Sequence, residues 1–139
     1  MRVEPYLNFD GRCEEAIEFY KSAVGAKVQM LMRFKDSPEQ PKEGCGGTAP
    51  GAENKVMHAS VTIGTSNIGC TDGQAQGKEK FAGISLSLAA ANDAEAQKVF
   101  AALGVGGNVI MPLTKTFFSS NFGMVQDRFG VHWMVLVAP

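Results

Sequence analysis

One helical motif occurs once in each half of this chain. Its first copy, EAIEFY, spans residues 15–20, and its second copy, EAQKVF, spans residues 95–100. A short apolar stretch precedes each copy, and a glycine followed by an extended stretch comes after it. This order predicts two modules with the pattern β-α-β-β-β. A single module of this kind leaves much of its sheet uncovered, so we expect the two modules to pair and enclose an interior.

The periodicity of apolar residues places the elements of each module. We expect one domain over residues 1–139, with a first module at about 1–75 and a second at about 80–139. The fold class is α+β, with paired βαβββ modules forming a curved, cup-shaped mixed sheet. Helices are expected at 13–24 and 93–103, capped by Gly25 and by Asn92 or Asp93, with Gly104 closing the second. Strands are expected at 3–9, 28–34, 56–63, 66–71, 81–88, 108–111, 122–126 and 131–137.

The composition excludes several classes of partner. The 13 basic and 14 acidic side chains are interspersed and give a net charge of −1, which argues against nucleic acid. No apolar run is long enough to cross a bilayer, and residues 1–5 lack the features of a signal peptide, so a cytoplasmic location is expected. The three cysteines are far apart and odd in number, which indicates reduced thiols.

Two glycine-containing loops carry no recognisable ligand-binding or catalytic motif. Residues 35–55 are rich in Pro, Gly, Glu and Lys and include Cys45 in a glycine cluster, but they carry no motif that assigns them a role. The glycines of residues 104–107 follow a helix, whereas a phosphate-binding loop precedes one. We therefore interpret them as a helix cap and a turn, and we expect no cofactor.

His58 and His132 are the two histidines of the chain, and each falls on the polar side of an expected strand. If those sides face a cavity, the two imidazoles can act as acid–base groups or as metal ligands. The alternative, which we favour, is that both are hydrogen-bonded or partly exposed imidazoles without a catalytic role.

Paired βαβββ modules resemble the vicinal oxygen chelate superfamily, which includes glyoxalase I, bleomycin-resistance proteins and extradiol dioxygenases. Four segments are similar to its PhnB-like branch. They are PYLNF at 5–9, EAIEFY at 15–20, VMHA at 56–59 and FGMVQDRFGVHWM at 122–134. Members of this branch have carried a demethylubiquinone methyltransferase label, but the sequence contains no recognisable methyl-donor site.

The resemblance also implies four metal-ligand positions, two in each module. Carried onto this chain by strand and hairpin, they fall on Pro5, Gly69, Gly83 and Met134. None of these residues offers the imidazole or carboxylate that hard divalent metals require. A shift of one residue in the register brings in no better ligands, so no metal is expected.

The same register sorts the faces of the strands. Ile84, Leu86, Leu88, Val131, Trp133, Val135 and Val137 are expected to face the helices. A ligand-binding cup on the other side is expected to be lined by small polar groups, two imidazoles and few charges, a surface suited to a neutral or aromatic small molecule. Its residues are Gln29, Arg33, His58, Ser60, Thr62, Thr71, Ser85, Ser87, His132 and Met134.

Together these patterns predict a cytoplasmic, homodimeric protein that binds a small molecule without a metal, as resistance proteins sequester a drug. An alternative is a lyase or isomerase that uses His58 or His132 as a general base. A third is a regulatory or interaction protein without a ligand.

Overall fold

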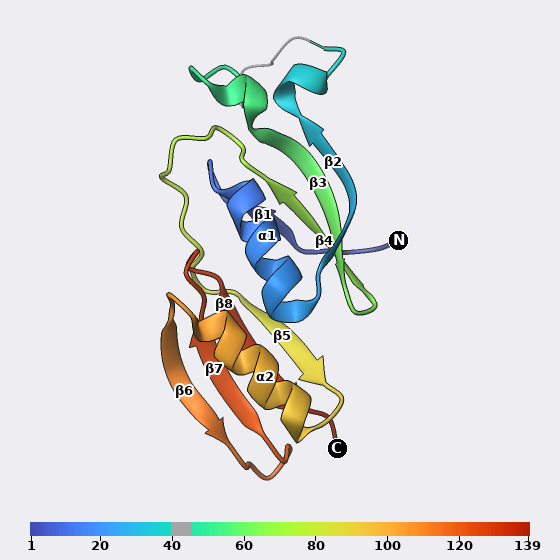
Figure 1. Cartoon of the computed structure of the whole chain (residues 1–139), viewed down its shortest axis with the longest axis vertical. Helices are drawn as coiled ribbons and strands as arrows, with labels where there is room; N and C mark the ends of the chain where they lie inside the picture. The colour runs from blue at the N-terminus through green and yellow to red at the C-terminus, as the bar shows by residue number, and fades with distance from the viewer. Residues whose placement is uncertain (40–45) are drawn as a thin grey trace. The chain divides into compact units, whose positions relative to one another are not determined.

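The computed structural model describes residues 1–39 and 46–139, so Cys45 and the start of its glycine cluster lie outside the described residues. The chain divides into two compact units, Met1–Glu79 and Lys80–Pro139. Figure 1 shows that each unit contains one α-helix and one sheet.

The first unit contains a four-stranded mixed sheet in the order β1-β4-β3-β2. Strands β1 and β4 are parallel, and the other neighbours are antiparallel. The elements are β1 (Tyr6–Asn8), α1 (Cys13–Val24), β2 (Lys27–Arg33), β3 (Val56–Ile63) and β4 (Ser66–Thr71), with short 3-10 turns η1 (Phe34–Asp36) and η2 (Ala52–Asn54) between β2 and β3.

The second unit repeats this topology. Its sheet has the order β5-β8-β7-β6, again with the first pair parallel and the others antiparallel. The elements are β5 (Ser85–Ala90), α2 (Asp93–Gly104), β6 (Asn108–Thr114), β7 (Phe122–Gln126) and β8 (His132–Val137). The predicted α+β class with two βαβββ modules is therefore confirmed.

The two helices begin and end close to the predicted positions. Gly25 caps α1 in the left-handed conformation, with φ of 69°, and its N–H bonds to the carbonyl of Tyr20. The Asn92 side chain caps α2 by accepting the N–H of Glu95 at 2.9 Å. The prediction that Gly104 lies beyond the second helix is wrong, because Gly104 is its last residue and Val105 occupies the cap.

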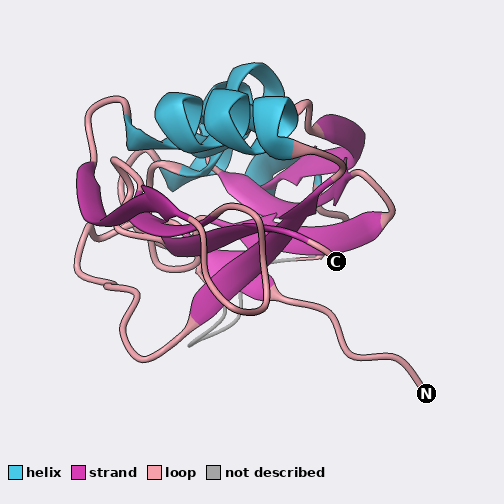
Figure 2. Ribbon diagram, turned by 90° about the horizontal axis from the view of Figure 1, so that it is seen from below, coloured by secondary structure: helices cyan, strands magenta, loops and turns pink. Residues whose placement is uncertain are grey.

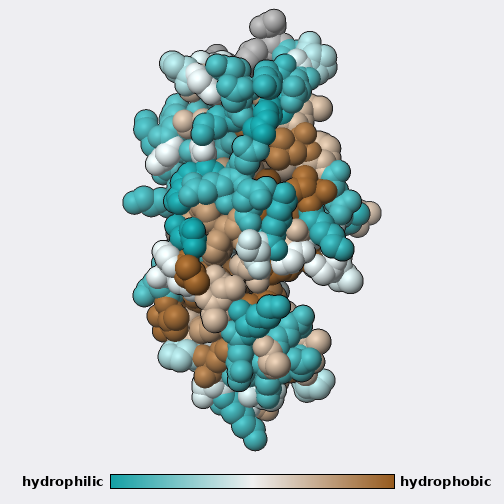
Figure 3. All heavy atoms as spheres, in the orientation of Figure 1, coloured by the Kyte–Doolittle hydropathy of each residue, from teal (hydrophilic) through white to brown (hydrophobic). Residues whose placement is uncertain are grey.

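Each helix packs against one face of its own sheet, as Figure 2 shows, and in the described part of the chain no helix of the same unit covers the other face. The outward side of both helices is hydrophilic (Figure 3), whereas the inward side is apolar. In the first unit Ile17 and Tyr20 of α1 are buried with Ala59 and Val61 of β3. In the second unit the Phe100 ring lies so close to Gly123 that a Cβ there would approach it to 2.8 Å. A glycine at this position therefore allows the helix to pack closely.

Two strands begin later than predicted. Strand β1 begins at Tyr6 instead of residue 3, because Pro5 has no N–H, although its carbonyl accepts the N–H of Gly69 at 2.9 Å. Strand β5 begins at Ser85 instead of residue 81, because Gly83 turns the chain with φ of 70°. Ile84 is 56% exposed, so its predicted place against a helix is wrong.

Strand β6 continues to Thr114, beyond the predicted end at residue 111, and includes Pro112. It is an edge strand, where the missing N–H of proline costs no ladder hydrogen bond. Within residues 1–39 and 46–139, no helix is both long and apolar enough to span a membrane.

The carboxylate of Asp72 joins three elements of the first unit. One oxygen accepts the N–H groups of Gly11 and Cys13 at 2.8 and 2.7 Å, at the start of α1. The other accepts the N–H of Val56 at 2.8 Å, at the start of β3. Asp72 itself directly follows β4 and is 1% exposed. Its negative charge also complements the positive end of the helix dipole.

Asp10 plays a similar part for the loop that follows β4. Its side chain accepts the N–H groups of Gln76, Lys78 and Glu79 at 2.8, 2.6 and 3.0 Å. Burial alone would raise the pKa of this carboxyl group, but these hydrogen bonds outweigh burial and lower the pKa below its usual 3.8. The loop from Asp72 to Glu79 is thus held against the turn between β1 and α1.

We expect Asp72→Ala to lower the free energy of unfolding by about 3 kcal/mol, because it leaves three backbone N–H groups without their buried acceptor. Chemical denaturation monitored by circular dichroism measures this change. Asp36→Ala is the matched control: this exposed carboxylate accepts the N–H of Arg33, and its loss should cost less than about 1 kcal/mol. Equal effects of the two substitutions would contradict the role assigned to Asp72.

Candidate functional site

The face of the first sheet that lies opposite α1 carries a row of residues in register across all four strands. Tyr6 pairs with Gly69, Gly69 with Ser60, and Ser60 with Met30. Side chains at paired positions lie on the same face of a sheet. Because Gly69 has no side chain, the Tyr6 ring lies directly over it, and a Cβ on Gly69 would come within 2.3 Å of that ring.

Tyr6 reaches across β4 in this way and contacts His58 on β3. The phenol oxygen and Nδ1 of the imidazole are 2.9 Å apart. The two ring planes differ by 9°, and the ring centroids are 5.6 Å apart. The two rings are therefore nearly parallel and offset from each other, and the hydrogen bond joins them.

The Tyr6 hydroxyl and the His58 imidazole are each able to donate or accept a hydrogen bond. Partial burial raises the pKa of the phenol above its usual 10.0, although a hydrogen bond with Thr71 opposes the shift. The phenol therefore keeps its proton at neutral pH and can donate it to Nδ1 when the imidazole proton is on Nε2. The pair thus combines an aromatic surface with groups that form hydrogen bonds.

The other predicted cup residues of the first unit separate into three environments. Ser60 lies half-buried on the open face, beside the Tyr6–His58 pair, and Gln29 donates to the Thr62 hydroxyl at 3.0 Å. Thr71 is buried, and its hydroxyl donates a hydrogen bond to the backbone carbonyl of Met57 at 2.8 Å. Arg33 lies elsewhere, at the end of β2 beside the helix.

The predicted cup residues of the second unit lie on one face of its sheet. Ser85 pairs with His132, and Ser87 pairs with Met134. Met134 also pairs with Met124 on β7. These four residues on β5 and β8, like the open face of the first sheet, lie opposite the helix of their own unit.

The four positions that correspond to the metal ligands of the resembled superfamily do not fit a hard divalent ion. Gly69 is covered by the Tyr6 ring, Pro5 and Gly83 offer no donor side chain, and Met134 offers a thioether. In the part of the chain that the structure describes, no three His, Cys, Asp or Glu side chains are grouped to hold a metal ion.

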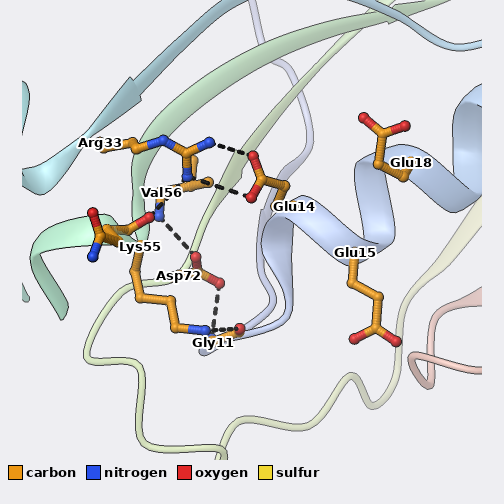
Figure 4. Close-up of a pocket in the computed structure, with 9 residues that line it drawn as sticks. Gly11, Glu14, Glu15, Glu18, Arg33, Lys55, Val56 and Asp72 are labelled. Carbon is orange, nitrogen blue, oxygen red and sulfur yellow. Dashed lines mark hydrogen bonds and ion pairs between the residues drawn. The ribbon is translucent and has the colours of Figure 1, made fainter. Parts of the chain in front are cut away.

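A pocket with a volume of about 550 Å³ lies between α1 and the ends of β2 and β3. Figure 4 shows Glu14 of α1 facing Arg33 of β2, with which it forms a bidentate ion pair. The guanidinium also donates to the carbonyl of Asn54 at 2.8 Å. The remaining lining residues are Gly11, Glu15, Glu18, Lys55, Val56 and Asp72.

The charges of this pocket are largely paired within the chain. Lys55 donates to the carbonyl of Gly11 at 2.9 Å, and Glu18 accepts from Lys21 at 2.7 Å. The N–H groups of Gly11 and Cys13 are already bonded to the Asp72 carboxylate, so these two are not available to an anionic ligand. The pocket is accordingly best explained as the junction that holds α1 on the sheet.

Sequence reasoning missed Tyr6 and Glu14 as members of these two sites. Tyr6 occupies the same side of its strand as Asn8, so alternation predicts a place on the open face, but nothing local indicates that its ring crosses Gly69. Glu14 and Arg33 are separated by a helix and a strand, and their pairing depends on the tertiary fold.

Comparison with known proteins shows several similarities that cover nearly the whole chain. Residues 1–136 match the family model described as 3-demethylubiquinone-9 3-methyltransferase. Protein YjdN of Escherichia coli (strain K12) is 32% identical over 140 residues, covering 99% of this chain and 95% of that protein. The crystal structure of protein PA1353 from Pseudomonas aeruginosa is 38% identical, with a TM-score of 0.83, and the match covers 99% and 98% of the two chains.

Two further structures connect the fold to named groups of proteins. A putative 3-demethylubiquinone-9 3-methyltransferase, a PhnB protein from Bacillus cereus, is 28% identical with a TM-score of 0.79, covering 99% of this chain and all of that one. A glyoxylase/bleomycin resistance protein/dioxygenase domain from Frankia sp. is 11% identical with a TM-score of 0.69, covering 99% and 95% of the two chains, a likeness of fold alone.

We expect Gly69→Ala to displace the Tyr6 ring and break its hydrogen bond to His58, since the added Cβ would lie 2.3 Å from that ring. The cost in stability should be on the order of 1 kcal/mol. The ¹⁵N chemical shift of His58 Nδ1 measures the loss, and it should change in the same direction as in Tyr6→Phe. Gly104→Ala is the control, because its Cβ meets only ordinary contacts, the nearest at 3.5 Å. An unchanged Nδ1 shift in Gly69→Ala would contradict the packing of Tyr6 over Gly69.

Proposed function

Because this chain belongs to the family described as 3-demethylubiquinone-9 3-methyltransferase, the PhnB-like relatives of glyoxalase and bleomycin-resistance proteins, we propose that it binds a small neutral or aromatic molecule on the open face of its first sheet. The observation that carries this proposal is the Tyr6–His58 pair, joined at 2.9 Å with nearly parallel rings. Two nearly parallel aromatic rings at the exposed surface favour stacking with a planar molecule.

The surroundings of the pair support a neutral ligand. Ser60 lies beside it, Gln29 and Thr62 follow along β2 and β3, and Met30 completes the row. These side chains offer hydrogen bonds and apolar contact without a formal charge. A binding surface that is mostly apolar, with a few placed polar groups, is typical of small-molecule sites.

Binding on this surface requires no divalent metal. The positions that would supply metal ligands carry Pro5, Gly69, Gly83 and Met134, whose side chains do not suit a hard cation. The open face offers the phenol and the imidazole instead. We therefore expect recognition to depend on ring stacking and hydrogen bonding.

A second candidate function is proton transfer by His58 in a lyase or isomerase. The Tyr6–His58 hydrogen bond favours it, because an imidazole oriented by a neighbouring hydroxyl is a common arrangement for a general base. In this mechanism Nε2 would face the substrate while Tyr6 holds Nδ1. Within residues 1–39 and 46–139 the His132 imidazole forms no such hydrogen bond, which gives His58 the stronger claim of the two.

Methyl transfer has less support from the described residues, despite the name of the family model. A glycine-rich loop that binds a nucleotide-like cofactor lies before the start of a helix. Near the start of α1 the N–H groups of Gly11 and Cys13 already bond to Asp72, and the glycines at 104, 106 and 107 come at or after the end of α2. A cytoplasmic location and a homodimeric assembly remain parts of this proposal.

The test is a screen of neutral indoles, phenols and quinolines by thermal shift, followed by titration of the hits. A compound that binds the native state raises the melting temperature. We expect Tyr6→Ala to weaken binding of such a compound at least about tenfold, because it removes half of the stacking surface. Affinity should be unchanged by EDTA.

His132→Ala is the matched control, since it removes an imidazole from the second sheet. Loss of binding in His132→Ala with full binding in Tyr6→Ala would contradict the proposed site. If the protein converts a bound compound, and His58→Ala abolishes this conversion while the affinity is unchanged, the result would favour the proton-transfer function.

A further inference from the structure

A row of methionines crosses the open face of the second sheet. Met134 on β8 pairs with Met124 on β7, and Met124 pairs with Met111 on the edge strand β6, where the register is irregular before and after Met111. Ser87 of β5 completes the row beside Met134. All three methionines are half-buried, so each lies at the surface of the sheet without being enclosed in the core.

The spacing of this row allows the three sulfur atoms to meet. Residues directly opposite on neighbouring strands have Cβ atoms about 4.5–5.5 Å apart. A methionine side chain is unbranched and has three rotatable bonds, so its sulfur can move several ångströms around its Cβ. Three such side chains on adjacent strands can therefore direct their sulfurs to one point above β7.

His132 lies next to this row and adds a nitrogen donor. It precedes Met134 by two residues on β8, so both side chains are on the same face. The neighbouring row across the sheet contains Ser85, His132, Gln126 and Asn108. Its members are uncharged apart from the imidazole, and no carboxylate belongs to either row.

This donor set has a definite chemical preference. Thioethers are soft ligands that select monovalent copper, whereas hard divalent ions need oxygen donors that these rows lack. Imidazole is also a good ligand for copper. We propose that Met111, Met124, Met134 and His132 form a binding site for a soft monovalent metal ion, Cu(I) or its redox-stable analogue Ag(I).

The proposed metal site uses residues of the second sheet, none of which belongs to the proposed small-molecule surface on the first sheet. It is also unlike the hard-metal centre of the resembled superfamily. Only Met134 falls on one of those four positions, and its thioether is unsuited to a hard ion but suited to a soft one. Met134 is thus a poor ligand for a hard divalent ion and a good ligand for a soft monovalent ion.

Titration of the full chain with Ag(I) tests this proposal. Cys45→Ser is used as the background, because a thiolate would compete for the ion, while Cys13 and Cys70 are buried. The chain contains seven methionines, and their ε-methyl groups can be labelled with ¹³C and followed by NMR. We expect the methyl signals of Met111, Met124 and Met134 to shift and to saturate at one equivalent of Ag(I).

Substitution at the centre of the row provides the decisive comparison. Met124→Leu should weaken Ag(I) binding by more than about tenfold, as expected for loss of one donor, and His132→Ala should weaken it as well. Met→Leu conserves volume, so the fold should be retained, and Met111→Leu is the second variant if it is not. The matched control is Met30→Leu, on the open face of the first sheet, which should leave the affinity unchanged.

Two outcomes would overturn the proposal. One is unchanged affinity for Ag(I) in both Met124→Leu and Met111→Leu. The other is a shift of the Met30 signal equal to that of Met124, which would indicate unspecific contact with exposed thioethers. Competition with bathocuproine disulfonate then extends the measurement to Cu(I), where the same order of variants is expected.

Discussion

The carboxylate of Asp72 is the interaction on which the first unit depends. It follows β4 directly and bonds to the backbone at the start of α1 and at the start of β3. Because a buried carboxylate must be fully hydrogen-bonded, these three elements meet at one place. This contact fixes the helix on one face of the sheet, and so determines which face stays open for Tyr6 and His58. It also places Glu14 of the helix opposite Arg33 of β2, which closes the nearby pocket with an ion pair.

The two units share one topology and present different chemistry. In each, a helix covers one face of a mixed sheet whose first strand is parallel to its neighbour. The open face of the first sheet has a ring pair over a glycine, whereas that of the second has a row of methionines beside a histidine. Alternation along a strand separates the residues that pack from those that face outward. Substitution on the open face can therefore change function without disturbing the core.

Much of this architecture can be predicted from local patterns. The bounds of α1, β3 and β4 agree with prediction because apolar spacing, a capping glycine and a tight turn all act within a few residues. The predicted starts of β1 and β5 are too early, because apolar residues continue upstream of Pro5 and Gly83 whereas strand pairing does not. Similarly, the strand pattern predicts that Arg33 lines the cup. In the structure its side chain instead forms an ion pair with Glu14 of α1. The backbone properties of proline and glycine therefore set the starts of the two strands. A residue distant in sequence sets the position of the Arg33 side chain. Apolar periodicity specifies neither.

By itself, the sequence determined the two βαβββ modules and the strand faces, because the period of apolar residues is a local property of helices and strands. Only the tertiary structure decided which polar residues act together. Tyr6 meets His58, and Asp72 meets the starts of α1 and β3, across separations in the chain that no local spacing encodes. Such contacts arise when strands distant in sequence become neighbours in a sheet, and side-chain chemistry is then set by the register between them.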